Sequence, residues 1–203
     1  ESKSGAIWRE LAMQIYCENG RDGFREIGHF PNGAPFLFGM TARISITHTG
    51  HLLAVATLPK TPESNLASFA QRTAMGIDAE RLDREQVIKV RDKFLSDAEK
   101  EFVAADNLEA NIIAWTAKEA LYKAAMTSGL DFKDAIKITS LPKIDRQMNL
   151  PGAPAPVIGT AVISIPMEEG DAMDVDMNLY SYESEGHCVT IAFSPKCAKF
   201  GRH

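Results

Sequence analysis

The sequence predicts an α+β protein in which helices pack on antiparallel sheets. Its predicted elements run helix, strands, helices, strands, and this grouping favours α+β over a parallel sheet with alternating helices. The β-rich segments are separated by Pro and Gly turns. Each half of the chain is expected to form one helix-on-sheet unit, with the boundary between residues 75 and 76. The similar strings HLLAVATLP and HCVTIAFSP suggest that the two halves are pseudo-symmetric.

The N-terminal half, residues 1–75, is predicted to contain one helix and two strands. Residues 5–20 place apolar side chains four apart and end at an Asn-Gly pair, which is typical of an amphipathic helix. Residues 42–58 are rich in β-branched side chains and contain the polar string THTG, which predicts two strands joined at residues 47–51. FPNGAP before them and PKTPESN after them are predicted as turn and surface loop.

The C-terminal half, residues 76–203, is predicted to contain helices followed by strands. AMGIDAE is expected to be a strand at a sheet edge or cleft, and Ser96 with Glu99 forms a capping-box signature for a helix start. A second helix is predicted over residues 109–126, ending at Ser128-Gly129. The predicted strands that follow are AIKITSL, VIGTAVISI, DVDMNLYSY and HCVTIAFSP. LPGAPAP is predicted to be an exposed connection.

Composition excludes several classes of protein. The 203 residues are 45% hydrophobic, enough for a core, and the formal net charge of −5 argues against a general nucleic-acid binder. Cys17, Cys188 and Cys197 lack CxxC spacing, so we expect reduced thiols, no zinc site and a cytoplasmic protein. No apolar run approaches the roughly 20 residues of a membrane span, and the first residues do not resemble a signal peptide.

The string MGIDAE carries two carboxylates two residues apart. Successive side chains of a strand point to opposite faces, so Asp78 and Glu80 are expected on one face, with Ile77 and Ala79 on the other. Two acids on one face repel each other. They are therefore either solvated at a sheet edge, which is the commoner case for such a pair alone, or bound to a shared cation.

The string WTAKEALYKAA provides further charged residues. At about 100° per residue, Trp115, Glu119 and Lys123 lie in one stripe of a helix. Taken alone, this is a surface Glu-Lys pair, worth about 0.2–0.5 kcal/mol, with Trp packed beneath. Taken together, Asp78, Glu80 and Glu119 suit a divalent cation of the Mg²⁺ type, and Lys123 would neutralise phosphate oxygens. This combination favours phosphoryl transfer.

These motifs resemble those of the 4′-phosphopantetheinyl transferases of the surfactin-synthetase-activating type. GIDAE matches the family's GxDxE motif, and WTAKEALYKA matches WxxKEAxxKA at the expected separation. NGAPFL and ISITHTG resemble its GxP segment and Ser-His-Ser element, and FLSDAEKEF resembles its F-[ST]-x-x-E stretch. The resemblance extends from about Asn32 to Leu130. GxDxE alone is a weak signal, whereas the two motifs together are specific.

The resemblance implies transfer of 4′-phosphopantetheine from coenzyme A to a serine of an apo carrier protein, with release of 3′,5′-ADP. It implies Mg²⁺, or alternatively Mn²⁺, on the pyrophosphate, with Asp78, Glu80 and Glu119 as metal ligands. Lys123 would contact the pyrophosphate. Glu119 would accept the serine proton, directly or through a metal-bound water, and Lys118 is a weaker candidate for that role and for a coenzyme A contact.

The resemblance further implies two pseudo-symmetric halves in one monomeric chain, enclosing a single coenzyme A site. The first half would supply coenzyme A contacts, and the second would supply the metal site and the WxxKEAxxKA helix. Thr47 and His48 match the Ser-His pair and would contact coenzyme A phosphates. Ala34 stands where many members have a basic residue. The candidates for binding the 3′-phosphate are Arg9, Arg43 and Arg72.

Carrier proteins are usually acidic, so a basic surface near the site is expected. Residues 81–94 hold five basic side chains, although interleaved acids make a solvated mixed-charge helix face an equal alternative. The main alternative function is a non-catalytic coenzyme A-binding regulator or scaffold of the same fold. A metal-dependent nuclease fits poorly, because Lys118 precedes Glu119 and the Glu-x-Lys order is absent. Fatty-acid, polyketide and peptide-synthetase carriers all remain open as substrates.

Overall fold

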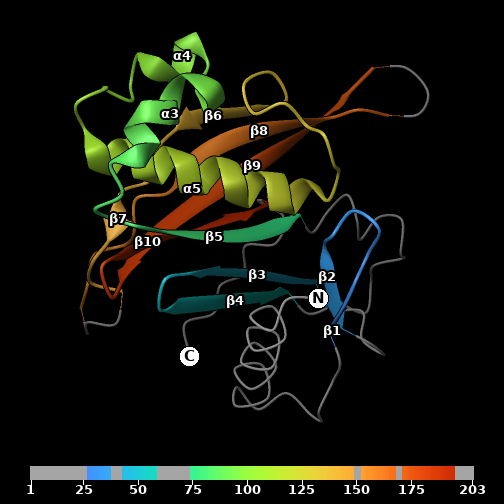
Figure 1. The fold of residues 1–203 in the computed structure, drawn as a ribbon, viewed down its shortest axis with the longest axis horizontal. Coiled ribbons are helices and arrows are strands. Elements are labelled where there is room, and N and C mark those ends of the chain that lie inside the picture. Colours follow the sequence, from blue (N-terminus) through green and yellow to red (C-terminus); the bar gives the residue numbers. More distant parts are fainter. Residues whose placement is uncertain (1–26, 38–42, 59–73, 149–151, 168–170, 195–203) are drawn as a thin grey trace.

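The computed structural model shows two antiparallel sheets, with helices over one face of the larger sheet (Figure 1). The predicted mixed class with antiparallel sheets is confirmed. The structure describes residues 27–37, 43–58, 74–148, 152–167 and 171–194. The predicted helix at residues 5–20 lies outside the described residues, as do Arg9, Cys17, Arg72 and Cys197. The equivalence of the two halves therefore stays a prediction.

The smaller sheet has the strand order β1-β2-β3-β4. Its strands are β1 (Ile27–His29), β2 (Pro35–Leu37), β3 (Arg43–Thr49) and β4 (Leu52–Leu58). The predicted strand pair is confirmed as β3 and β4, but the turn is shorter than expected because β3 continues to Thr49. Only Gly50, with φ +54°, and His51 separate the strands. FPNGAP makes the predicted turn, yet β1 and β2 on either side of it were not predicted.

The larger sheet has the strand order β5-β10-β9-β8-β6. Its strands are β5 (Met75–Arg81), β6 (Ile136–Ser140), β8 (Gly159–Ile165), β9 (Met173–Ser184) and β10 (His187–Phe193). All five lie where the sequence predicts strands. β7 (Ile144–Asp145), which pairs with β9 in parallel, is too short to leave a sequence pattern.

The helices of the described part of the chain cover one face of the larger sheet (Figure 1). They are α3 (Gln86–Phe94), α4 (Asp97–Lys100) and α5 (Leu108–Ala125). The predicted capping box at Ser96 is confirmed, although α4 ends after one turn, where Val103 enters the core. The predicted long helix is confirmed as α5, and it ends when Met126 takes a left-handed φ of 52°. None of the described helices is long and apolar enough to cross a membrane.

Helix α5 lies very close to β5. Its buried face carries small side chains that let the two backbones approach. These are Ala114, Ala117, Ala120 and Ala124. A Cβ on Gly76 of β5 would overlap Ala120 O and lie 2.7 Å from Ala124 N. The glycine of GIDAE is therefore required by helix packing.

A buried polar chain connects α5 to the sheet beneath it. Thr116 Oγ1 and Thr190 Oγ1 are 2.7 Å apart, and Ser181 Oγ lies 2.7 Å from the same Thr190 oxygen. Cys188, a free and fully buried thiol, lies 3.7 Å from Thr116 and Thr190, and burial raises its pKa. Cys188 is the one cysteine among the described residues, so the reduced state expected for the three cysteines stays a prediction.

The two sheets meet where β3 faces β5. Ile77 N donates to Ser45 Oγ at 3.1 Å, and Thr47 Oγ1 donates to Asp78 Oδ1 at 3.0 Å. Ile77 and Ala79 lie in one apolar cluster with Val189 and partly buried side chains of β4. The contact between sheets therefore runs through side chains of β3, with Asp78 part of it.

Replacing Gly76 with alanine is expected to destabilise the protein by about 3 kcal/mol or more, because the new methyl group overlaps α5. Urea unfolding monitored by circular dichroism measures this loss. The matched control is Gly129→Ala, which meets no atom within 4 Å but keeps a φ of +78°. It is expected to lose only about 1–2 kcal/mol. Equal losses would contradict the packing explanation.

Candidate active site

Three elements bring a carboxylate, an ammonium and a hydroxyl together. Asp78 of β5 is 8% exposed, and its Oδ1 accepts from Lys123 Nζ of α5 at 2.7 Å and from Thr47 Oγ1 of β3 at 3.0 Å. Lys123 Nζ also donates to Ile77 O at 3.1 Å. The predicted residues Thr47, Asp78 and Lys123 thus form one cluster.

Glu119 lies one helical turn before Lys123 and belongs to the same cluster electrostatically. Burial raises the pKa of Glu119, and the charge of Asp78 raises it further. Burial also raises the pKa of Asp78, against the opposing effects of Lys123 and Thr47. Two carboxylates with raised pKa values in one region are typical of a functional site.

Glu80 is held apart from this cluster. It is 4% exposed, forms an ion pair with Arg84, and accepts a hydrogen bond from Arg81 N at 2.9 Å. In the described part of the chain, no three His, Cys, Asp or Glu side chains are grouped so that they could hold a metal ion. The predicted ligand set of Asp78, Glu80 and Glu119 stays a prediction, and Arg84 would compete with the cation for Glu80.

The donor chemistry of Asp78 and Glu119 nevertheless fits a hard divalent cation. Both offer carboxylate oxygens, the ligands that Mg²⁺ prefers. Each carboxylate's pKa is raised, so a negative charge is unfavourable there without a cation nearby. Lys123 supplies part of that positive charge. A divalent cation would supply more.

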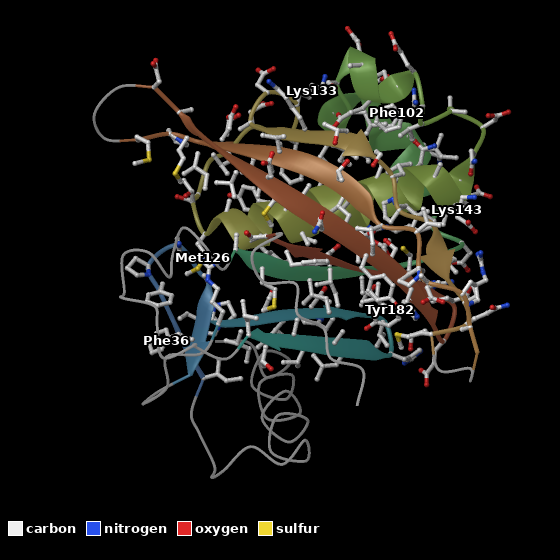
Figure 2. All side chains as sticks on the ribbon, turned by 180° about the vertical axis from the view of Figure 1, so that it is seen from behind. Phe36, Phe102, Met126, Lys133, Lys143 and Tyr182 are labelled. Carbon is white, nitrogen blue, oxygen red and sulfur yellow. The ribbon has the colours of Figure 1, made fainter. Side chains whose placement is uncertain are left out.

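A cavity of about 460 Å³ opens beside Lys123. Its walls come from the β1-β2 hairpin, from β3, and from the C-terminal end of α5. The predicted residues Arg43, His48 and Lys123 all line it. Figure 2 shows Met126, another lining residue, at the end of α5 beside the strands of the smaller sheet. The cavity thus lies between the segments that the sequence assigns to the two halves.

Arg43 and Asn32 hold the end of α5. Arg43 donates to Ala124 O at 3.3 Å and to Met126 Sδ at 2.5 Å, and Asn32 Nδ2 donates to Met126 O at 2.5 Å. The last carbonyls of a helix lack partners within the helix, and a cation there is favourable. Arg43 therefore has a structural role at the cavity wall, and its predicted contact with a phosphate stays a prediction.

The structure does not bring Lys118 into the site. Its side chain is 0% exposed, forms an ion pair with Glu99 Oε1 at 2.6 Å, and donates to Phe132 O and Ile136 O, both at 2.5 Å. An ammonium has three donors, and these contacts use all three. Burial lowers the pKa of Lys118 against the effect of Glu99. Its predicted contact with coenzyme A and its role as a base are therefore not supported.

Glu99 has a larger role than the predicted cap. Besides accepting from Ser96 N at 2.8 Å, its carboxylate accepts from Ile138 N at 2.7 Å and pairs with Lys118. It connects α4, α5 and β6 in the core. The sequence contained a clue to this pair, because Glu99 lies in the motif FLSDAEKEF and Lys118 lies in the motif WTAKEALYKA.

Trp115 packs as the sequence predicts. Its ring meets Phe94 edge-on at 5.1 Å and stacks on Phe132 at 6.4 Å, centroid to centroid. These contacts fix α5 against α3 and against the loop that follows α5. Trp115 is thus explained by packing alone.

The basic residues around α3 are partly used within the chain. Arg81 pairs with Asp83, Arg84 pairs with Glu80, and Arg91 donates to Asn111 Oδ1 and Val103 O. These contacts favour the mixed-charge alternative for the three arginines. The other two basic side chains of the segment, Lys89 and Lys93, are exposed.

Carboxylates, a lysine and an adjoining cavity form the equipment of a group-transfer enzyme for phosphate-containing substrates. Residues 74–158 match the family model of the 4′-phosphopantetheinyl transferase superfamily. The matched segment includes Asp78, Glu119 and Lys123. It supports phosphopantetheinyl transfer as the general activity of this region. No curated protein matches the chain.

Replacing Lys118 with methionine is expected to destabilise the fold by about 3–5 kcal/mol, because Glu99 would keep a buried charge without its partner. Chemical denaturation measures the loss. Lys137→Met changes an exposed lysine on β6 and is expected to stay within about 0.5 kcal/mol of wild type. A Lys118→Met loss below about 1 kcal/mol would contradict the assignment of this pair to the core.

Replacing Glu119 with glutamine is expected to raise the melting temperature at pH 7. A carboxyl whose pKa is raised by folding binds more protons in the folded state, so its stabilising effect exists at low pH and is lost as pH rises. The gain over wild type should shrink as pH falls towards about 4.3, the unfolded value. Calorimetry from pH 4 to 7, with exposed Glu101→Gln as control, tests this. A lower melting temperature at pH 7 would contradict it.

Proposed function

We propose that this protein transfers 4′-phosphopantetheine from coenzyme A to a serine of an apo carrier protein, releasing 3′,5′-ADP in a Mg²⁺-dependent reaction. The observation that carries the proposal is the placement of Lys123. It joins Asp78 at 2.7 Å and also lines the cavity, in the segment that matches the superfamily. The ammonium group of Lys123 thus lies between Asp78 and the cavity that we assign to the substrate.

The cavity suits a ligand with phosphates and an apolar arm. Its volume is within the usual range of about 300–1,000 Å³ for small-molecule sites. Lys123, Arg43 and His48 supply polar groups, while Ile44 and Tyr122 supply apolar and aromatic surface. Two of the three donors of Lys123 contact Asp78 and Ile77 O, which leaves one for a phosphate oxygen.

The carboxylates would serve as cation ligands. Asp78 and Glu119 would hold Mg²⁺, or Mn²⁺, which accepts the same oxygen donors, and Glu80 would join them after leaving Arg84. When bound, the cation would neutralise charge on the pyrophosphate. Lys123 would stabilise the same charge from the helix.

The chemical step transfers one phosphoryl group. The serine oxygen attacks the phosphorus that bears the pantetheine arm, and the bond from that phosphorus to the bridging oxygen breaks. The bridging oxygen leaves with the electron pair as part of 3′,5′-ADP. Glu119 would take the serine proton, directly or through a water, because a carboxylate beside the cation lies near the attacking oxygen.

The carrier is expected to approach along α3. Lys89 and Lys93 are exposed there and offer positive charge to an acidic partner. The proposal retains a cytoplasmic monomer with residues 1–75 as the coenzyme A half and residues 76–203 as the catalytic half. A non-catalytic coenzyme A-binding protein would need the same cavity but would not use Glu119.

Intact-mass spectrometry tests the proposal directly. An apo acyl carrier protein incubated with this protein, coenzyme A and Mg²⁺ is expected to gain the mass of phosphopantetheine, and EDTA is expected to prevent the gain. Glu119→Gln should slow transfer by about 10²–10⁴-fold, the usual contribution of general base catalysis. Lys123→Ala should cost about 10²-fold or more through lost charge stabilisation. Lys137→Ala, far across the sheet, should match wild type.

Three outcomes would count against the proposal. Coenzyme A binding without transfer to any of several carriers would favour the non-catalytic alternative. Full activity of Glu119→Gln would show that the base is wrongly assigned. Failure to bind coenzyme A would show that the cavity is not a coenzyme A site.

A further inference from the structure

Thr47 makes a contact that its sequence motif does not predict. The motif suggests a coenzyme A phosphate ligand, but Thr47 Oγ1 donates to Asp78 Oδ1 at 3.0 Å. The side chain is 5% exposed. Its neighbours Ile46 and His48 line the cavity, whereas Thr47 is not among the described lining residues. The hydroxyl therefore points to the carboxylate.

The hydroxyl cannot serve both partners. A threonine has one O–H donor, and phosphate oxygens of a bound ester are acceptors. The O–H group of Thr47 already donates to Asp78, whose carboxylate is an acceptor just as a phosphate is. A phosphate contact would thus require Thr47 to leave a buried carboxylate, and an unsatisfied buried acceptor is costly.

Asp78 depends on Thr47 most when Lys123 is occupied elsewhere. Both hydrogen bonds of the cluster end on Asp78 Oδ1, one from Thr47 and one from Lys123. Lys123 also lines the cavity, where a bound phosphate would compete with Asp78 for its ammonium group. Thr47 is buried on β3, where Ser45 Oγ also accepts from Ile77 N at 3.1 Å. It is the donor that stays in place.

We propose that Thr47 is a positioning residue that fixes the Asp78 carboxylate from the neighbouring sheet and does not contact substrate. The expected effect of Thr47 on the reaction rate rests on the proposed transferase function. The expected effect on cation binding does not require transfer activity. Loss of the hydroxyl weakens cation binding at Asp78 and leaves the affinity for coenzyme A unchanged.

Three variants test the proposal. Thr47→Val removes the hydroxyl at nearly constant shape, and Thr47→Ser keeps it. Thr139→Val is the matched control, because it removes a Thr139–Thr160 hydrogen bond of 2.7 Å on β6, at the opposite edge of the larger sheet. Mn²⁺ is the probe, and its binding to the full chain with saturating coenzyme A is followed by electron paramagnetic resonance. Melting temperatures confirm folding.

Thr47→Val is expected to bind Mn²⁺ about tenfold more weakly, the usual effect of losing a hydrogen bond to a metal ligand. The Mg²⁺ concentration for half-maximal rate should rise by about the same factor, and KM for coenzyme A should change less than about twofold. Thr47→Ser and Thr139→Val should match wild type in all three quantities. Thr47→Ala replaces Thr47→Val if the latter does not fold.

A tenfold rise in KM for coenzyme A with unchanged Mn²⁺ affinity would overturn the proposal and identify Thr47 as a phosphate ligand. Weak Mn²⁺ binding by Thr47→Ser, an equal loss in Thr139→Val, or no Mn²⁺ binding by wild type would also overturn it. An absence of transfer activity in the wild-type protein would contradict the proposed function. A Mn²⁺ loss confined to Thr47→Val would still support the positioning role in that case.

Discussion

The candidate site depends on the close approach of α5 to β5. Gly76 leaves room for the helix backbone, and the alanines of α5 keep it near the sheet. Lys123 and Asp78 lie on these two elements, so backbone packing largely sets the 2.7 Å contact between them. Well-packed interiors respond to the addition of even one methyl group. The glycine thus sets the geometry of the candidate site without contributing a side chain to it.

A second constraint acts on the same stretch of α5. Lys118 is buried with Glu99, whereas the next residue, Glu119, belongs to the site. A turn of about 100° between neighbours separates the two environments. The buried pair is costly to break, and its complete hydrogen bonding explains how two charges are tolerated in the core. One helix therefore carries a structural charge and a charge of the candidate site side by side.

Local patterns predicted much of the fold. The period of residues 109–126, the alternation in AMGIDAE and the Ser96 cap each specify structure within a few residues, and each element is observed. β1, β2 and β7 are too short for such patterns. Most of the cluster was predicted as well, since Asp78, Lys123 and Thr47 were all assigned to the site.

The partners of individual side chains were harder to predict. Glu80 with Arg84, Thr47 with Asp78, and Lys118 with Glu99 are choices made by tertiary packing. Sequence spacing gives the direction of a side chain, but several partners compete for one carboxylate. The sequence did permit a better prediction for Lys118. It lies close to the apolar face of the helix, and a residue in that position turns inward.

The matched segment, residues 74–158, is not a self-contained catalytic module. Asn32 and Arg43, which hold the last carbonyls of α5, precede it, as do one wall of the cavity and the hydroxyl of Thr47. Strands β8, β9 and β10, which complete the larger sheet, all begin after it. Recombination that exchanged this segment alone between related chains would move the acids and the lysine but leave behind the groups that orient them.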